Sequence, residues 1–306
     1  MDNIFRIKSI TQFHELLKLP APDHPLVSFH REGSKNSYDE LDDALFDMRF
    51  TTDMYSIMYK DSVSGSLGYG RNSYDFQHGT LVFLAPGQVI TTPSKETLQH
   101  SKGWSLLFHP DLIRKSPLGE NIDDYRFFSY DVNEALHLSK KEENFIFEVV
   151  KQIEEEYSQN LDKHSQRLII SNLELLLNYC TRFYDRQFYT RTNFNKDFVT
   201  RFEHKLKAYF NSSKPTELGI PTINYFGSEL NMSGNYLSDL LKKETGKSIK
   251  THINEIIVDK SKTILLNSTA SVSEIAYNLG FEYPQSFTRL FKKETGISPL
   301  EYRNLN

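Results

Sequence analysis

Two copies of one basic pentapeptide mark the part of the sequence whose side chains have the clearest chemistry. The letters KKETG occupy residues 242–246 and recur at 292–296. Apolar residues precede each copy at matching spacing: Leu237, Leu240 and Leu241 in the first, Phe287, Leu290 and Phe291 in the second. The phosphate-binding candidates are therefore Lys242, Lys243, Lys292 and Lys293. Lysines at the end of a helix can bind nucleic-acid phosphates, and they are also favoured there by the helix dipole when they are merely solvated.

Polar residues on the same predicted helices have side chains that can read the edges of bases. The candidates are Gln285, Ser286, Thr288 and Arg289 in the second helix, and Asn235, Tyr236, Ser238 and Asp239 in the first. Arginine can form two hydrogen bonds with guanine and glutamine two with adenine, whereas serine and threonine suit either base. The alternative for Arg289 is an ordinary surface ion pair. Because phosphates repel a carboxylate, Asp239 either accepts a hydrogen bond from cytosine or makes the first helix the weaker reader.

Each copy is predicted to be positioned by two helices joined through a short turn. Ser271 and Glu274 have the spacing of a capping box, which predicts the start of a helix. Gly280 predicts the left-handed end of that helix. Gly227 and Ala276 occupy equivalent places in the two copies, and both are small, as a close crossing of two helices requires. The pattern predicts two helix-turn-helix motifs.

The stretch between the copies, residues 249–266, reads as a single helix. Its length would be about 27 Å, which is close to the roughly 34 Å that separates successive major-groove turns of DNA. The alternative is a repeat of helical hairpins that only pack together. Such solenoids need about three repeats, and two copies occur here, so we favour DNA binding.

Residues 271–303 resemble the signature of the AraC family of bacterial transcriptional regulators. The matching letters are I-A at 275–276, G-F at 280–281, F-T-R-L-F-K-K at 287–293, G-x-x-P at 296–299 and Y-R at 302–303, with L-N-M-S-x-x-Y-L at 230–237 and KKETG in the first copy. The resemblance implies an all-α domain at 193–306 with two helix-turn-helix motifs that bind double-stranded DNA. It also implies an activator of transcription, with RNA polymerase as a partner.

The part of the chain before residue 193 is predicted to contain strands and then helices. Short apolar runs separated by turn residues predict antiparallel strands, and the resemblance implies a cupin-like β-barrel at 1–138 that senses a small effector. Residues 139–192 are predicted to form a helical dimerisation segment and a linker. An apolar stripe runs through Ile169, Leu173, Leu176, Cys180 and Phe183, and it is widened by Leu175 and Leu177. Such a helix is either deeply buried or shared with a second subunit. The predicted fold class is α+β.

Tyr59, His78 and Trp104 are candidates to line the effector pocket, with ordinary core packing as the alternative. The sequence has ten histidines but no His-x-His, so we expect no metal site in the barrel and no cofactor. It also has no Gly-rich phosphate loop and no G-x-S-x-G motif. We therefore expect a protein that is not an enzyme. The alternatives are a cupin-type barrel enzyme fused to a DNA-binding module, and a regulator that needs no ligand.

The net charge of −4 conceals an asymmetry along the chain. Residues 196–306 carry a net charge of +3 and residues 1–195 a net charge of −7, which fits a nucleic-acid-binding C-terminal third. No apolar run approaches the ~18 residues of a membrane helix, and the first residues do not resemble a signal peptide. We expect a cytoplasmic homodimer that has no membrane partner and is modulated by a small effector.

Overall fold

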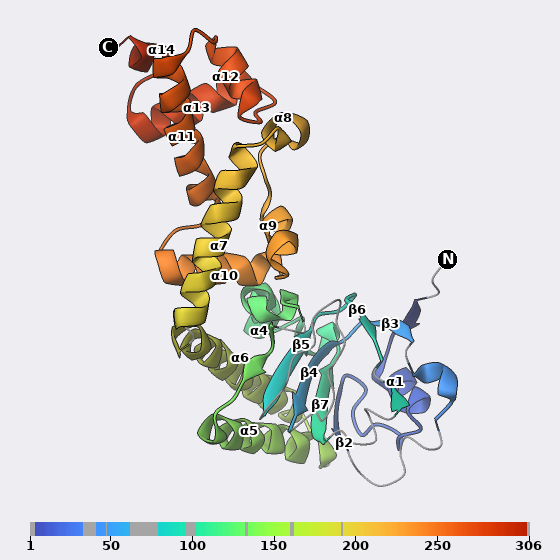
Figure 1. The fold of residues 1–306 in the computed structure, drawn as a ribbon. Helices are drawn as coiled ribbons and strands as arrows, with labels where there is room; N and C mark the ends of the chain where they lie inside the picture. Colours follow the sequence, from blue (N-terminus) through green and yellow to red (C-terminus); the bar gives the residue numbers. More distant parts are fainter. Residues whose placement is uncertain are drawn as a thin grey trace. The chain divides into compact units, whose positions relative to one another are not determined.

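The computed structural model describes residues 4–32, 41–46, 48–61, 79–92, 94–95, 102–131, 134–159, 162–190 and 192–304. The chain folds as two compact units, Met1–Gln187 and Phe188–Asn306 (Figure 1). Sheets and helices make up the first unit, whereas the second is helical, so the α+β class is confirmed. Within the described part, no helix combines the length and apolar character needed to cross a lipid bilayer.

The strands of the N-terminal unit belong to two sheets. The larger sheet has the order β2 (Val27–Glu32), β7 (Gly103–Phe108), β4 (Tyr55–Lys60), β5 (Thr80–Leu84) and β8 (Leu136–His137), with antiparallel pairing throughout. The smaller sheet joins β1 (Phe5–Ile7), β3 (Arg49–Thr52) and β6 (Val89–Thr91). Strand β1 pairs with β3 in parallel, so the prediction of antiparallel strands is wrong at this edge. Because the described strands form two separate sheets, the cupin-like barrel stays a prediction.

The two faces of the larger sheet pack against different partners. On one face, the rings of Tyr59 and Trp104 stack with centroids 5.7 Å apart, beneath Phe147 of helix α5 (Lys140–Ser158). On the other face, Met58 packs in an apolar cluster with Ile90 of the smaller sheet. The two sheets therefore enclose the Met58 side of β4, and the Tyr59 side faces a helix.

Helices flank the strands of this unit. Those in the described ranges are α1 (Ile10–Leu16), α3 (Pro110–Ile113), α4 (Pro117–Asn121), α5 and α6 (Ser165–Thr190), with short 3-10 turns at Asp43–Leu45, Ile122–Asp124 and Arg126–Ser129. Helix α5 begins at a capping box in which the Ser139 hydroxyl accepts from the Glu142 N–H and the Glu142 carboxylate accepts from the Ser139 N–H. The predicted stripe of α6 is buried, including Leu177, but Leu175 is 40% exposed.

The C-terminal unit is a set of helices around one apolar core. They are α7 (Thr192–Phe210), α8 (Lys214–Leu218), α9 (Ile223–Leu230), α10 (Gly234–Thr245), α11 (Ile249–Asn267), α12 (Val272–Asn278), α13 (Pro284–Thr295) and α14 (Pro299–Arg303). The core includes Phe226 and Leu237 from the first repeat, Phe287 and Phe291 from the second, and Ile257 from the helix between them. This arrangement places both repeats against α11.

Candidate nucleic-acid interface

The first repeat forms a helix-turn-helix from α9 and α10. Asn231 ends α9 in the left-handed conformation, and the Ser233 hydroxyl caps α10 by accepting from the Tyr236 N–H at 3.1 Å. A Cβ atom at Gly227 would lie 2.6 Å from the carbonyl oxygen of Met232, in the turn between the helices. Any larger residue at 227 would therefore push the turn away, which confirms the prediction of a close crossing.

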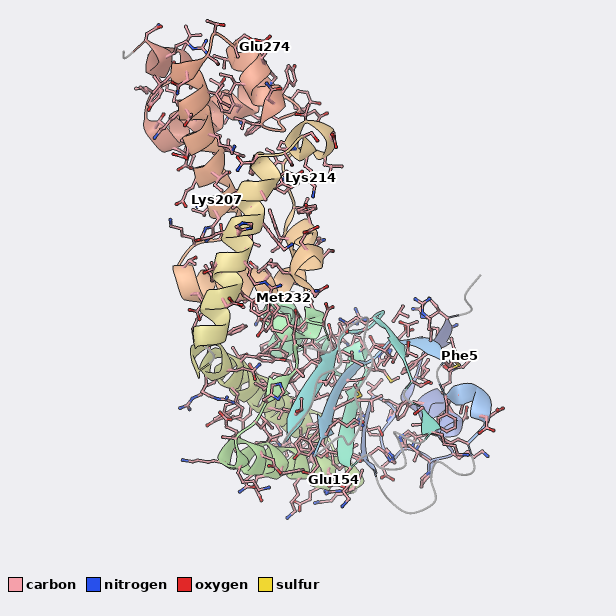
Figure 2. All side chains as sticks on the ribbon, in the orientation of Figure 1. Phe5, Glu154, Lys207, Lys214, Met232 and Glu274 are labelled. Carbon is pink, nitrogen blue, oxygen red and sulfur yellow. The ribbon has the colours of Figure 1, made fainter. Side chains whose placement is uncertain are left out.

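The second repeat forms an equivalent motif from α12 and α13. Ser271 and Glu274 make the predicted capping box, and Gly280 adopts a φ of +90° after α12. Pro284 occupies the first turn of α13, where its missing N–H leaves no helical hydrogen bond unmade. Met232 in the first motif and Glu274 in the second mark the two motifs in Figure 2. Both KKETG runs end at glycines of positive φ, Gly246 and Gly296.

Helix α13 presents most of its candidate reading residues to solvent. Gln285, Ser286 and Arg289 are exposed, while Phe287 and Phe291 point into the core. Thr288 is half-buried, and its hydroxyl donates to the Pro284 carbonyl at 3.1 Å. The polar face of α13 therefore offers one guanidinium, one amide and one hydroxyl that are accessible together.

Helix α10 presents its candidates less openly. Asn235, Ser238 and Asp239 are half-buried. Tyr236 is only 4% exposed, so its ring is not accessible to a base edge as the sequence had suggested. An amphipathic tyrosine fits either side of a helix, and the sequence carries no signal that separates these two placements.

The four candidate lysines all lie in the last turns of the two motif helices. Lys242 and Lys243 end α10, and Lys292 and Lys293 end α13, with exposed side chains in every case. They follow the candidate reading residues of the same helix by three to eight positions. This is the position from which a cation can reach the sugar-phosphate backbone while neighbouring residues approach the bases.

Arg303 has a positioning role that the sequence analysis missed. Its Nε donates to the Leu265 carbonyl at 3.2 Å, and its Nη2 donates to the Ala270 carbonyl. These bonds join α14 to the end of α11 and the start of the second motif. The sequence signal for this role is the Y-R pair at 302–303, which follows the capping box of Ser298 and Glu301.

Two of the candidate effector residues, Tyr59 and Trp104, stack on each other in the N-terminal unit. Tyr59 and Trp104 are buried beneath α5, and the Trp104 indole N–H has no hydrogen-bond partner among the described residues. Burial raises the pKa of Tyr59, and the neighbouring Glu143 carboxylate raises it further. His78 lies outside the described residues.

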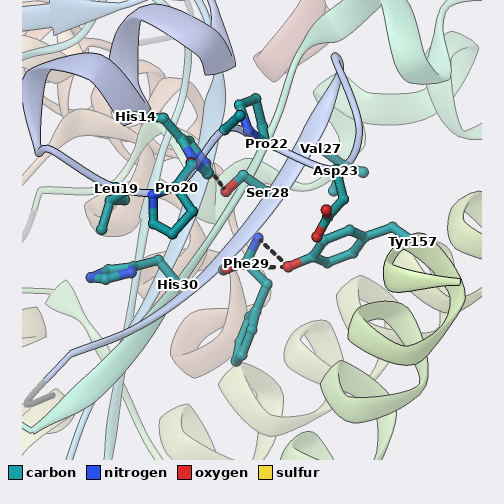
Figure 3. Close-up of a pocket in the computed structure, with 11 residues that line it drawn as sticks. His14, Leu19, Pro20, Pro22, Asp23, Val27, Ser28, Phe29, His30 and Tyr157 are labelled. Carbon is teal, nitrogen blue, oxygen red and sulfur yellow. Dashed lines mark hydrogen bonds between the residues drawn. The ribbon is translucent and has the colours of Figure 1, made fainter.

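A cavity of about 160 Å³ lies elsewhere in the N-terminal unit, beside strand β2 (Figure 3). His14 spans part of it, with Nδ1 bonded to the Pro20 carbonyl and Nε2 2.6 Å from the Ser28 hydroxyl oxygen. Because a carbonyl only accepts, the Nδ1 atom carries a proton. On the opposite side, the Tyr157 hydroxyl accepts from the Phe29 N–H at 3.2 Å and donates to the Phe29 carbonyl at 3.1 Å.

Metal and thiol chemistry would depend on the possible metal ligands and the one cysteine in the part of the chain that the structure describes. No three histidine, cysteine or acidic side chains lie together there in a way that could hold a metal ion. Cys180 is fully buried on α6, and burial raises the pKa of its thiol. The Cys180 thiolate, which is the reactive form, is therefore disfavoured.

Comparison with known proteins relates mainly to the C-terminal unit. Residues 227–305 match the sequence family described as a helix-turn-helix domain. The Msm operon regulatory protein of Streptococcus mutans is 33% identical over 101 residues, which are 32% of this chain and 36% of that protein. The transcriptional activator RhaR of Escherichia coli is 27% identical over 162 residues, which are 52% of this chain and 54% of RhaR.

A solved structure also resembles part of this chain. It is the C-terminal domain of AraT, a response regulator from Geobacillus stearothermophilus, with 29% identity, a TM-score of 0.32, and coverage of 36% of this chain and 85% of that one. The chain spans between about a third and about half of the length of the two curated relatives above.

Proposed function

Because the C-terminal unit carries an AraC-type helix-turn-helix domain, we propose that the protein is a DNA-binding regulator of transcription that reads two successive major-groove turns. The observation that carries this proposal is the exposed polar face of α13, where Gln285, Ser286 and Arg289 lie opposite the buried Phe287. Residues of these types form the usual contacts with base edges. Asn235, Ser238 and Asp239 would provide the second, less exposed reading surface.

Selection of duplexes from a random pool by the purified full-length protein tests this function. We expect enrichment of a bipartite motif whose two parts lie about ten base pairs apart, because each motif helix would enter one turn of the groove. The same selection with a Gln285→Ala and Arg289→Ala double variant serves as the control and should enrich no motif in the part read by α13. Recovery of random sequences by the unmodified protein would contradict the proposal.

Lys292 is expected to bind a phosphate rather than a base. The Lys292→Ala variant should weaken binding to specific and random DNA alike, and the slope of log affinity against log salt should become shallower by about one unit. Fluorescence anisotropy over a range of salt concentrations measures this slope. Lys141→Ala, which removes an exposed lysine from α5 in the N-terminal unit, is the matched control. A slope equal to that of the unmodified protein would exclude Lys292 from the phosphate contacts.

We propose that helix α6 forms the dimer interface. Leu168 and Leu175 are 47% and 40% exposed and lie two helical turns apart on α6, outside its buried stripe. Two leucines left in water at this spacing form an apolar strip that a second copy of the helix can cover. The DNA site is then expected to occur as two half-sites.

Changing both leucines to glutamate should separate the dimer. Full burial of one leucine contributes roughly 1.5–3 kcal/mol. The dimer would cover only the exposed 47% of Leu168 and 40% of Leu175 in each subunit, so loss of these two side chains from both subunits should weaken dimerisation by about a hundredfold or more. Sedimentation velocity measures the change in mass. Asn144→Glu with Gln152→Glu adds the same charge to exposed positions of α5 and should leave the dimer intact. A double leucine variant that remains dimeric would rule out this face.

We further propose that the N-terminal unit binds a small effector and that the cavity beside β2 is its site, in place of Tyr59, His78 and Trp104. Support comes from the convergence of His14, Ser28 and Tyr157 on one pocket. A regulator of this kind would act in the cytoplasm and contact RNA polymerase, and the activator RhaR among its relatives supports activation. We propose no catalytic role for either unit.

A further inference from the structure

The short segment between α7 and α9, residues 211–222, contacts both helix-turn-helix motifs. It contains α8 and the turn that follows it, and Pro215 of α8 is buried in the C-terminal unit. Lys214, at the start of α8, marks the segment in Figure 2. The role inferred for this segment rests on the proposed reading of DNA by both motifs.

The segment contacts the second motif through two glycine backbones. Gly219 ends α8 with a φ of +79°, and Gly280 lies in the turn between α12 and α13 with a φ of +90°. A Cβ atom at Gly280 would lie 2.7 Å from the Gly219 carbonyl carbon and 2.9 Å from the Ile220 nitrogen. The two backbones therefore meet at a distance that admits only glycine at position 280.

The same segment contacts the first motif through a hydrogen bond. The Nζ atom of Lys214 donates to the Tyr225 hydroxyl at 2.8 Å, and Tyr225 belongs to α9. The charge of Lys214 also lies over the Tyr225 ring, 5.4 Å from its centroid. The segment thus touches the first helix of one motif and the turn of the other.

Tyr209 of α7 holds this segment in place from the core. Its side chain is buried, its ring packs edge-to-face on that of Tyr225 with centroids 5.0 Å apart, and its hydroxyl donates to the Gly219 carbonyl at 2.8 Å. Burial raises the pKa of Tyr209, which keeps the hydroxyl protonated and therefore a donor. The Tyr209 side chain therefore contacts Tyr225 of the first motif and also Gly219, which meets the turn of the second motif.

We propose that residues 211–222, held by Tyr209, are a second connection between the two motifs, in parallel with α11, and that this connection sets the separation of α10 and α13. A single helix joined to each motif through a turn leaves two places at which the motifs can rotate. A second contact away from the axis of α11 removes that rotation. Tyr209 and Gly280 are positioning residues in this proposal, because they act through the segment.

The test varies the spacing within the bipartite DNA motif. Fluorescence anisotropy with the full-length protein compares duplexes of the selected spacing with duplexes that have one base pair removed or added between the two parts. The unmodified protein should lose about tenfold or more in affinity on altered spacing, comparable to the loss of one base contact. Tyr209→Phe removes only the hydroxyl, and it should lose less than about threefold on altered spacing while binding the selected duplex more weakly. Gly280→Ala should behave likewise.

A matched control separates this role from general stability. Tyr302→Phe also removes one tyrosine hydroxyl from the C-terminal unit, where the Tyr302 ring packs on Phe291, and this variant should keep the sharp dependence on spacing. An equally sharp dependence in Tyr209→Phe would overturn the second connection, and so would an unmodified protein that tolerates every spacing. Failure of the unmodified protein to select any motif would instead overturn the proposed function, so the two failures are distinguishable.

Discussion

Replacing Arg289 with alanine is expected to reduce affinity for the selected DNA site by about 5- to 150-fold, because a bidentate contact with a base contributes roughly 1–3 kcal/mol of discrimination. Arg289 is exposed on α13 beside Gln285 and Ser286. The variant should also accept other bases at one position of the motif. Binding to random DNA should fall much less, because that binding depends mainly on phosphate contacts.

Competition binding against duplexes that differ at single positions measures both effects of this variant. Arg289→Lys is the informative control, since lysine keeps the positive charge but lacks the planar pair of donors that guanidinium presents to guanine. We expect Arg289→Lys to relax base choice almost as much as alanine does. Full recovery of base choice by lysine would show that Arg289 contributes charge alone. Equal losses on specific and random DNA in the alanine variant would exclude base reading altogether.

The C-terminal motifs were predictable from sequence because short-range signals determine them. The capping box of Ser271 and Glu274 lies within four residues, and Gly246, Gly280 and Gly296 each mark a left-handed turn next to the helix that they end. The apolar period then assigns Phe287 and its neighbours to the core. Exposure of Gln285, Ser286 and Arg289 follows from the same period, because it places them opposite Phe287.

The N-terminal unit was less predictable because alternation along a strand defines two faces without saying what covers each. The rings of Tyr59 and Trp104 lie beneath Phe147 of α5, and the alternation along their strands does not indicate this cover. The parallel pairing of Phe5–Ile7 with β3 depends on residues more than forty positions apart. Local turn chemistry carries no information on such pairing.

Long-range contacts explain what else was missed in the C-terminal unit. Nothing near Gly280 indicates that it meets Gly219, and nothing near Arg303 indicates the carbonyl groups of Leu265 and Ala270. Burial of Tyr236 likewise depends on what packs against α10 rather than on its position in the helix. The sequence pattern therefore predicted the helices of the interface better than the long-range contacts that hold them together.

Replacing Phe287 with alanine should destabilise the C-terminal unit by about 3–5 kcal/mol, the usual cost of removing a fully buried phenylalanine ring. Phe287 is 0% exposed, and its ring packs on those of Phe281 and Phe291 with centroids 5.6 and 5.9 Å away. The cavity left by alanine lies directly beneath the reading face of α13. DNA binding should therefore be lost at temperatures at which the N-terminal unit is still folded.

Urea unfolding followed by two signals separates the units. The only tryptophan, Trp104, lies in the N-terminal unit, so its fluorescence reports that unit, whereas helical circular dichroism reports the C-terminal unit as well. In Phe287→Ala, the circular dichroism transition should move to lower urea and the Trp104 transition should stay in place. Gln285→Ala, an exposed change on the same helix, should move neither. A Phe287→Ala protein whose two transitions match those of the unmodified chain would contradict the assignment of Phe287 to the core, and with it the orientation of α13 on which the proposed reading of DNA depends.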